Sequence, residues 1–383
     1  MKLGVLKETC EGERRVSLVP ELVSSYAKLG IEVLFEPGAG EDANFGDEAY
    51  LGKGAKSTSK NQLLHDSDIL LCVRTLGANP KSYRDDLEKM HPGQLLVGFL
   101  DPLDAPSAIQ DAAKKGITAF AIELLPRITR AQSMDALSSM ATITGYKAAV
   151  IAAEALPKIF PMLMTAAGTL LPARVFVIGA GVAGLMAIAT AKRLGAKVRA
   201  YDVRPAVKEQ IQSLGASFVE LGLEQKKAED ESGYARAMDE SFYQKQRELL
   251  GEVLSESDVV ISTALVPGKL APVLITEAMV QAMPKGSVIV DVAAERGGNC
   301  ELTKPGSVAV KHGVTILGPT NLPSSVPQHA SMMFARNMFN FLKPIFIEGR
   351  LEIDLEDQVL RESLVAKDGN VVHPRVIDLL RGG

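Results

Sequence analysis

The chain has 383 residues, of which 46% are hydrophobic and 23% charged, and its formal net charge is −4 at pH 7. This composition is typical of an ordinary soluble globular protein, and the small negative charge gives no reason to expect a nucleic-acid partner. No apolar run approaches the roughly 20 residues of a membrane span. The length predicts two domains of roughly 150–200 residues. Three scattered cysteines, Cys10, Cys72 and Cys300, predict neither a disulfide framework nor a metal site and favour a reducing cytosol.

Residues 1–125 alternate short apolar strands with helical stretches, which is the rhythm of a parallel, doubly wound sheet. Helices are expected over Pro20–Leu29 and Ala105–Lys115, because each is followed by a glycine that can end it. The turn Leu100–Asp104 has no assigned role. No glycine-rich phosphate-binding motif occurs in residues 1–125, so no nucleotide site is expected there. The expected strands are Lys2–Lys7, Ile31–Glu36, Asp68–Val73, Gln94–Leu100 and Thr118–Leu124.

A second α/β unit follows a loop at Pro126–Ser133 and a long helix that ends near Leu156. Six strands are expected in it, a full set for a Rossmann domain. They are Arg174–Ile178, Lys197–Tyr201, Ser217–Glu220, Val259–Ser262, Ser287–Asp291 and Val314–Leu317.

The C-terminal region is expected to return to the first domain through a helix over Gln328–Phe346. Its tail predicts strands at Leu351–Leu355 and Val359–Val365 and a hairpin turn at Asp368-Gly369 before Asn370–Val372. The predicted fold class is therefore α/β, with two Rossmann-like doubly wound parallel-sheet domains joined by long helices and a cleft between them. The first domain would comprise residues 1–133 plus 328–383, and the second domain, with the long helix between the two, residues 134–327.

The most informative motif follows the first strand of the second unit, where Gly179, Gly181 and Gly184 form the pattern G-x-G-x-x-G. One glycine makes a tight turn, one lets backbone N–H groups approach a pyrophosphate, and one lets the helix pack closely on the strand. The next strand ends in Asp202, 18 residues after Gly184, the reach needed to hydrogen-bond a ribose 2′-hydroxyl. A carboxylate there repels a 2′-phosphate, so the pattern favours NAD(H) over NADP(H), although nearby Arg204 weakens this inference.

Two loops have an unusual polar content. The first leads into the long helix and contains Arg127, Gln132 and Asp135. Capping of the helix by Ser133 or Asp135 explains some of these residues, but it does not explain an arginine and a glutamine in the same turn. The second loop, residues 226–238, lies beside the expected nucleotide site and is either a surface insertion or a lid.

Together these motifs resemble the alanine dehydrogenase and nicotinamide nucleotide transhydrogenase family over essentially the whole chain. Within that family the chain looks like the NAD(H)-binding alpha subunit (domain I) of proton-translocating transhydrogenase. The most specific resemblance is the Arg127, Gln132 and Asp135 loop together with the loop around Tyr234. The motifs that carry the resemblance are Lys7-Glu8, Glu13–Val16, Pro126-Arg127, Ala131–Asp135, Met164–Gly168, Gly179–Gly184, Ser232–Ala235, Thr263–Gly268 and Arg296–Cys300.

The resemblance implies roles for individual residues. Arg127, Gln132, Asp135 and Ser138 would border the nicotinamide and its ribose, with Gln132 closest to the hydride path, and Tyr234 would close over the nucleotide. No metal is implied. The other residues implied to bind NAD(H) are Gly179, Gly181, Val182, Gly184, Asp202, Val203, Arg204, Gly233, Gln246, Ala264 and Leu265.

The same resemblance implies partners. NADP(H) would be bound by a separate partner subunit, and membrane-spanning subunits would couple hydride transfer to proton translocation. The chain would be a homodimer without a membrane span, cytoplasmic and peripheral on the inner face of the membrane through its partners. Hydride transfer between two nicotinamides needs no general base, only two rings held at near-contact with water excluded.

An amino-acid dehydrogenase that acts alone is the main alternative. Resemblance to alanine dehydrogenases implies a histidine acid/base and a substrate-binding lysine in the first domain, but no histidine lies between His91 and His312, and Cys72–Arg74 lacks the lysine. Amino-acid oxidation without a proton acceptor would be poor chemistry. Arg15 remains, either as a substrate ligand or as half of a structural ion pair. A non-catalytic NAD-sensing or scaffold protein is the third possibility and would not need the cluster of Arg127, Gln132 and Asp135.

Overall fold

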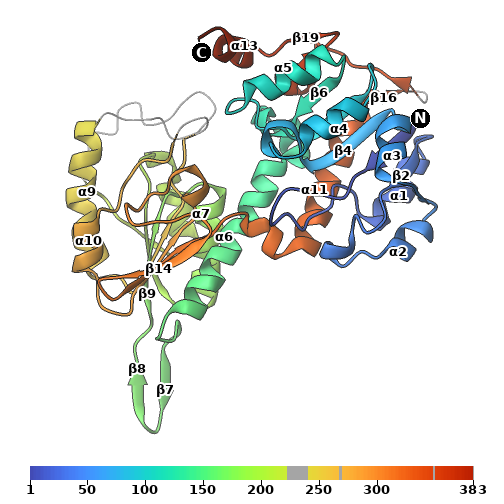
Figure 1. Cartoon of the computed structure of the whole chain (residues 1–383). Coiled ribbons are helices and arrows are strands. Elements are labelled where there is room, and N and C mark those ends of the chain that lie inside the picture. The colour runs from blue at the N-terminus through green and yellow to red at the C-terminus, as the bar shows by residue number, and fades with distance from the viewer. Residues whose placement is uncertain (222–239, 267–269, 348–349, 383) are drawn as a thin grey trace. The chain divides into compact units, whose positions relative to one another are not determined.

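The computed structural model describes residues 1–221, 240–266, 270–347 and 350–382, and the chain folds into two compact units (Figure 1). Unit 1 comprises Met1–Met140 and Pro323–Gly383, and unit 2 comprises Ala141–Leu322. The first crossing between units therefore falls inside the long helix α6 (Ala136–Ala155) rather than in front of it.

Unit 1 is built on an eight-stranded sheet in the order β19-β18-β6-β5-β4-β1-β2-β3. Strands β1 to β6 pair in parallel, and β18 adds antiparallel to β6. The parallel strands have the order 3-2-1-4-5-6 of a doubly wound fold, which confirms the predicted fold class for this unit. The strands are β1 Lys2–Val5, β2 Glu32–Phe35, β3 Lys56–Ser57, β4 Ile69–Arg74, β5 Leu95–Phe99, β6 Thr118–Ala121, β18 Leu364–Lys367 and β19 Asn370–Val371.

Unit 2 has a seven-stranded sheet in the order β11-β10-β9-β12-β13-β15-β14. Six strands again follow the order 3-2-1-4-5-6, so the strand order reverses between β9 and β12, where such folds bind ligands. The antiparallel edge strand β14 (Ser307–Lys311) was not predicted. The other strands are β9 Arg174–Ile178, β10 Lys197–Tyr201, β11 Ser217–Phe218, β12 Val259–Ser262, β13 Val288–Asp291 and β15 Val314–Gly318.

Helices cover the faces of both sheets, and the central strands are buried on both sides. The sequences of these central strands are therefore continuous and mostly apolar, as in β12 and β13, where every residue is buried. Helix α11 is a core element of unit 1, because its apolar face, with Phe334, Met338 and Phe341, is almost fully buried. The helices are α1 Pro20–Ala27, α2 Asp47–Leu51, α3 Lys60–Asp66, α4 Tyr83–Lys89, α5 Pro106–Lys114, α6, α7 Val182–Arg193, α8 Lys208–Ser213, α9 Glu240–Ser255, α10 Glu277–Ala282, α11 Pro327–Leu342, α12 Gln358–Ser363 and α13 Pro374–Gly382.

The C-terminal tail departs from the sequence prediction. The strand predicted over Val359–Val365 is wrong, because most of that stretch forms helix α12. Asp357 caps this helix, its carboxylate accepting a hydrogen bond from the Val359 N–H at 3.0 Å. The predicted hairpin turn is confirmed: Asp368 and Gly369 have φ of 50° and 80° between β18 and β19, the positive values that a two-residue turn of this kind requires.

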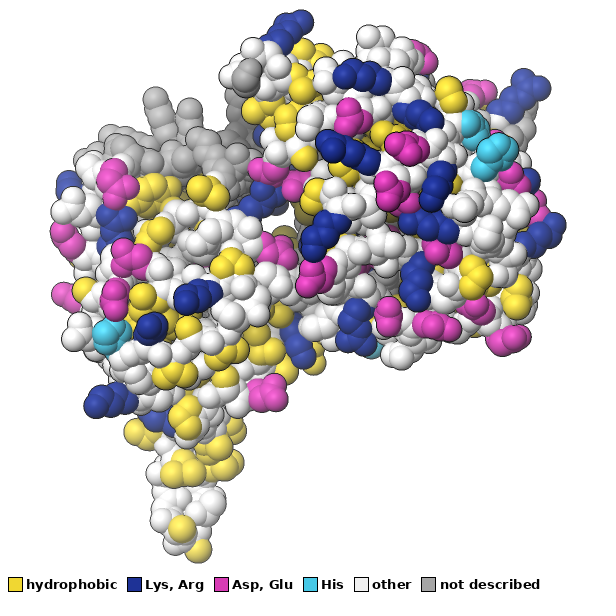
Figure 2. All heavy atoms as spheres, in the orientation of Figure 1, with side chains coloured by type: hydrophobic (Ala, Val, Ile, Leu, Met, Phe, Trp, Pro, Cys, Tyr) yellow, Lys and Arg dark blue, Asp and Glu magenta, His cyan; other side chains and the backbone are white. Residues whose placement is uncertain are grey.

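A short hairpin, β7 (Leu163–Thr165) and β8 (Gly168–Leu170), projects from unit 2 and was not predicted (Figure 1). It carries apolar side chains that gather on its surface in Figure 2. Met164 is 76% exposed and Leu171 is 79% exposed.

Candidate nucleotide-binding site

The glycine loop after β9 has the geometry that its sequence predicts. Gly179 has a φ of +91°, which a residue with a side chain rarely adopts. A Cβ on Gly184 would lie 1.9 Å from the Gly179 carbonyl oxygen, so only glycine allows α7 to pack this close to the strand. A Cβ on Gly181 would meet nothing within 4 Å. Gly181 therefore faces open space, whereas the other two glycines are required by the fold.

That open space lies at the N-terminus of α7. Gly181 is the N-cap of this helix and offers no side-chain hydrogen bond to its first turn. The first N–H groups of a helix have no partner within the helix, and the helix macrodipole places positive charge at this end. An anionic phosphate fits such a position, and Val182 beside it is exposed. The loop thus fits the pyrophosphate of a dinucleotide.

Asp202 stands at the end of β10 and is 4% exposed. Its carboxylate accepts hydrogen bonds from the Ala180 N–H at 2.6 Å and from the Arg204 N–H at 2.8 Å. The Arg204 guanidinium donates to both carboxylate oxygens, each at 2.9 Å. These four donors match the four lone-pair positions of a carboxylate. A ribose hydroxyl can therefore bond to Asp202 only by displacing one of them.

The loop after β12 is fixed by Asn299. The Asn299 side chain accepts from the Ala264 N–H at 3.1 Å and donates to the Ala264 carbonyl at 2.8 Å. It also donates to the Pro272 carbonyl at 2.9 Å and is fully buried. Leu265, next in the chain, is 41% exposed. The loop is thus held rigidly while Leu265 remains accessible at the strand end where ligands bind in this fold.

A second buried residue, Asp291, organises the same strand end. Its carboxylate accepts from the Ser262 hydroxyl at 3.1 Å, the Cys300 N–H at 2.9 Å and the Thr303 hydroxyl at 2.7 Å. Neither Asp291 nor Asn299 was predicted to be a site residue. The sequence did contain a clue to Asp291, because this residue ends an otherwise apolar strand. Ligands bind at the carboxyl ends of the strands in this fold.

Gln246, which was predicted to bind NAD(H), is a buried residue. Gln246 is 1% exposed, and its amide donates to the Tyr201 hydroxyl at 3.1 Å. Its Oε1 has no hydrogen-bond partner among the described residues. The structure thus places Gln246 against the core, behind β10. Gly233 and Tyr234 lie outside the described residues.

The polar loop of unit 1 contains a short 3₁₀ helix, η4 (Thr129–Met134), just before α6. Arg127 and Gln132 are both exposed, and the Gln132 side chain makes no hydrogen bond within the described residues. Asp135 and Ser138 cap α6: the Asp135 carboxylate accepts from the Ser138 N–H at 2.8 Å and from its hydroxyl at 2.5 Å. The capping interpretation therefore holds for Asp135, whereas Gln132 has no capping role.

Arg15 forms a buried ion pair in the structure. Its guanidinium donates to both oxygens of Glu13, at 2.7 and 2.6 Å, and both side chains are at most 2% exposed. Burial opposes ionisation of Glu13, but the hydrogen bonds and charge of Arg15 outweigh it and lower the pKa of Glu13 to about 2. Of the two roles considered for Arg15, substrate ligand or half of a structural ion pair, the structure supports the ion pair. Arg15 is therefore not available for a substrate carboxylate.

The turn Leu100–Asp104 is held by the half-buried Glu123. Glu123 accepts from the Leu100 N–H at 2.7 Å and from the Asp101 N–H at 2.6 Å. Asp101 has a φ of +52°, so the carboxylate stabilises a strained turn. Burial raises the pKa of Glu123 to about 7.

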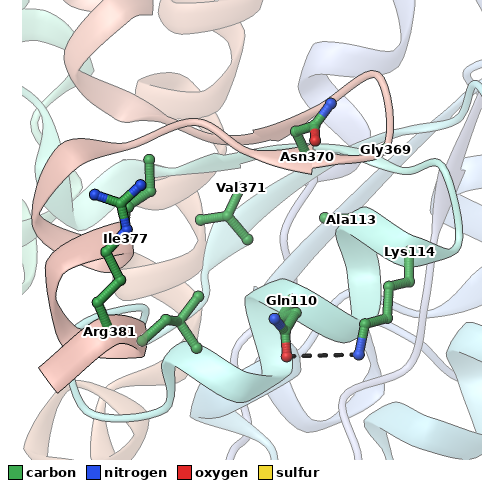
Figure 3. Close-up of a pocket in the computed structure, with 9 residues that line it drawn as sticks. Gln110, Ala113, Lys114, Gly369, Asn370, Val371, Ile377 and Arg381 are labelled. Carbon is green, nitrogen blue, oxygen red and sulfur yellow. Dashed lines mark hydrogen bonds between the residues drawn. The ribbon is translucent and has the colours of Figure 1, made fainter. Parts of the chain in front are cut away.

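A pocket of about 360 Å³ lies in unit 1 and contains none of the predicted site residues (Figure 3). It is formed by α5, the β18–β19 turn and α13, and Gln110 accepts a long 3.5 Å contact from Lys114 at its edge. Among the described residues no group of three His, Cys, Asp or Glu side chains could hold a metal ion. Across the same described ranges no helix is long and apolar enough to cross a membrane.

Two family models match nearly the whole chain. The N-terminal domain of alanine dehydrogenase/PNT matches residues 4–144, and its C-terminal domain matches residues 148–374. The chain therefore belongs to the alanine dehydrogenase/PNT family, whose members are pyridine-nucleotide-binding oxidoreductases of two Rossmann-like domains.

Similarity within the family points to one branch. The chain is 47% identical to an NAD(P) transhydrogenase alpha subunit of Rhodospirillum rubrum, covering 98% of both chains. Its structure resembles that of a transhydrogenase from Sinorhizobium meliloti with a TM-score of 0.86 and 39% identity, covering 97% and 100% of the two chains. Alanine dehydrogenase of Bacillus subtilis is 28% identical, over 98% and 94% of the chains. The chain is a member of the NAD(P) transhydrogenase alpha-subunit branch, which confirms the resemblance found in its motifs.

Proposed function

We propose that this chain binds NAD(H) and that the bound nicotinamide exchanges a hydride with NADP(H) held by a partner subunit of a proton-translocating transhydrogenase. The observation that carries the proposal is the geometry around Gly181. An exposed glycine faces open space at the N-terminus of α7, within a Rossmann strand order, in a chain similar to transhydrogenase alpha subunits.

The residues of unit 2 hold the nucleotide. Backbone N–H groups around Gly181 and Val182 donate to the pyrophosphate, and the Ala264–Leu265 loop, fixed by Asn299, borders the adenosine end. Asp202 and Arg204 form the ribose-facing pair. The negative charge of Asp202 excludes a 2′-phosphate only while Arg204 stays paired with it, because an unpaired guanidinium would bind that phosphate.

The residues of unit 1 act at the nicotinamide. Bound NADH supplies the hydride, so the protein needs to orient the ring and exclude water rather than move a proton. Gln132, exposed and without a hydrogen-bond partner among the described residues, orients the nicotinamide ribose. Arg127, Asp135 and Ser138 border it.

No observation favours an amino-acid dehydrogenase. Arg15, which such an enzyme would use for a substrate carboxylate, here donates hydrogen bonds from two guanidinium nitrogens to Glu13. The turn at Leu100–Asp104 has no histidine in it and is instead held by Glu123. Oxidation of an amino acid would lack both a substrate ligand and a proton acceptor.

The partners follow from the proposed role. NADP(H) and the proton path belong to separate subunits, and the chain is peripheral on the cytoplasmic face of the membrane through them. The exposed apolar hairpin β7–β8 supports a homodimer, since Met164 and Leu171 would be covered by the second copy.

Gln132→Asn tests the proposal, because it keeps the amide and shortens its reach by one methylene. NADH binding should barely change, while single-turnover hydride transfer to an NADP analogue, with the partner subunit present, should fall at least about 10²-fold. Wild-type chain given NADH, pyruvate and ammonia should show no turnover. Activity in that assay without a partner subunit, or a normal single-turnover rate in Gln132→Asn, would contradict the proposal.

A further inference from the structure

The carbonyl of Ser133, next to Gln132, is held by two asparagine side chains. Asn337 donates its amide to this oxygen at 2.9 Å, and Asn340 donates to the same oxygen at 3.0 Å. Residues three apart on a helix lie on the same face, so α11 presents both donors to one carbonyl. The two lone pairs of that oxygen are thereby both used.

The donors are fixed in place by the core of unit 1. Asn337 is 6% exposed, and its neighbours Phe334, Met338 and Phe341 are at most 1% exposed. Phe334 and Phe341 also make ring contacts with aromatic side chains of the unit 1 sheet, at centroid distances of 5.4 and 5.3 Å. Because α11 is held in a close-packed core, its asparagine side chains cannot shift together with the loop. They hold the loop to the core instead.

The other end of η4 is held independently. The Arg130 guanidinium lies 2.5 Å from the carboxylate of Asp357, which also caps α12. Between the two anchors Ala131 and Met134 are buried, at 1% and 5% exposed. Gln132 is thus an exposed residue in a segment that is fixed on both sides.

The asparagine pair is not needed to cap α6. Asp135 and Ser138 already provide that cap through two hydrogen bonds. The Ser133 carbonyl lies outside the helix, two residues before its N-cap. The pair therefore fixes the backbone beside Gln132 rather than the helix that follows.

We propose that Asn337 and Asn340 are positioning residues for hydride transfer, which fix the backbone at Ser133 and so place the Gln132 side chain. This inference rests on the proposed function of Gln132. The two asparagines touch no nucleotide; they act only through the loop. A displacement of about 1 Å at a reacting group lowers a rate about 100-fold, so two hydrogen bonds that prevent such a displacement matter for the rate and not for affinity.

Asn337→Asp and Asn340→Asp test the inference, because a carboxylate has nearly the same shape but cannot donate to a carbonyl. Each should slow single-turnover hydride transfer about tenfold in the chain reconstituted with its NADP(H)-binding subunit. The dissociation constant for NADH should stay within about twofold. The matched control is Asn370→Asp, since Asn370 donates to the Asp368 carbonyl at 3.0 Å in the β18–β19 turn and should leave the rate unchanged.

A double-mutant cycle with Gln132→Asn separates positioning from general destabilisation. If the asparagines act through Gln132, either Asp variant should have little further effect in the Gln132→Asn chain, a strong departure from additivity. Equal fractional losses in both backgrounds would overturn the inference. So would normal rates in both Asp variants while Gln132→Asn is slow. A normal rate in Gln132→Asn itself overturns the proposed function instead. If Asn337→Asp fails to fold, half-buried Asn340→Asp alone decides the question.

Discussion

Alanine substitutions at Gly181 and Gly184 separate the nucleotide site from the fold. The two glycines belong to one motif, yet the structure places them in opposite surroundings. A Cβ at Gly181 meets nothing within 4 Å, and the φ of −72° suits any residue. A Cβ at Gly184 falls 1.9 Å from the Gly179 carbonyl oxygen and 2.8 Å from its carbon. We therefore expect Gly181→Ala to impair binding and Gly184→Ala to impair both binding and stability.

The magnitudes follow from these distances. Gly181→Ala should change the free energy of unfolding by about 1 kcal/mol or less, the scale of an N-cap substitution. Its methyl group would stand where the pyrophosphate approaches and would remove a hydrogen bond to a charged group, worth about 1.5–3 kcal/mol. This corresponds to a roughly 10- to 100-fold weaker affinity for NADH. Gly184→Ala should destabilise unit 2 by about 1–3 kcal/mol or more, because the backbone must move to relieve the contact.

Calorimetry and the fluorescence of NADH itself measure the affinities, since the chain has no tryptophan. Thermal unfolding without nucleotide measures the stabilities. Wild-type affinity in Gly181→Ala would refute a pyrophosphate at this loop. Equal destabilisation by both variants would refute the claim that only Gly184 is required by packing.

Three further outcomes are expected. Asp202→Ala should weaken NADH binding and reduce the preference for NADH over NADPH, because Arg204 loses its partner and becomes available to a 2′-phosphate. If parallel titrations with NADH and NADPH gave an unchanged ratio of affinities, Asp202 would not be at the ribose. Leu171→Asp should convert a dimer to monomers in light scattering after size exclusion, since it places a charge on an exposed apolar arm, and a dimer that persists would place the interface elsewhere. Glu13→Gln should destabilise unit 1 by about 3–5 kcal/mol at pH 7, because the buried guanidinium of Arg15 loses the negative charge that it pairs with. Because the pKa of Glu13 is lowered to about 2, the difference in the free energy of unfolding between wild type and variant is complete above about pH 4.5 and is lost as the pH falls toward 2. A difference that grows on acidification would contradict this prediction.

The sequence alone determined the fold class and the glycine loop, because both depend on local patterns. Buried parallel strands must be apolar throughout, and a tight turn between strand and helix needs glycine at fixed spacing. The same holds for the Asp368-Gly369 turn, whose conformation is set by two residues. A local pattern also misled, since the apolar run Val359–Val365 suits a strand, and the Asp357 cap makes most of it a helix.

Which polar residues are available to a ligand depends on contacts between segments that are far apart in the sequence. Arg15 and Glu13 are near neighbours in sequence, yet the bidentate geometry and burial of their ion pair appear only in the fold. Asn337 lies 204 residues from Ser133, and Asn299 lies 35 from Ala264. Spacing in sequence carries no information about such contacts, because a hydrogen bond depends on where packed elements bring donor and acceptor together.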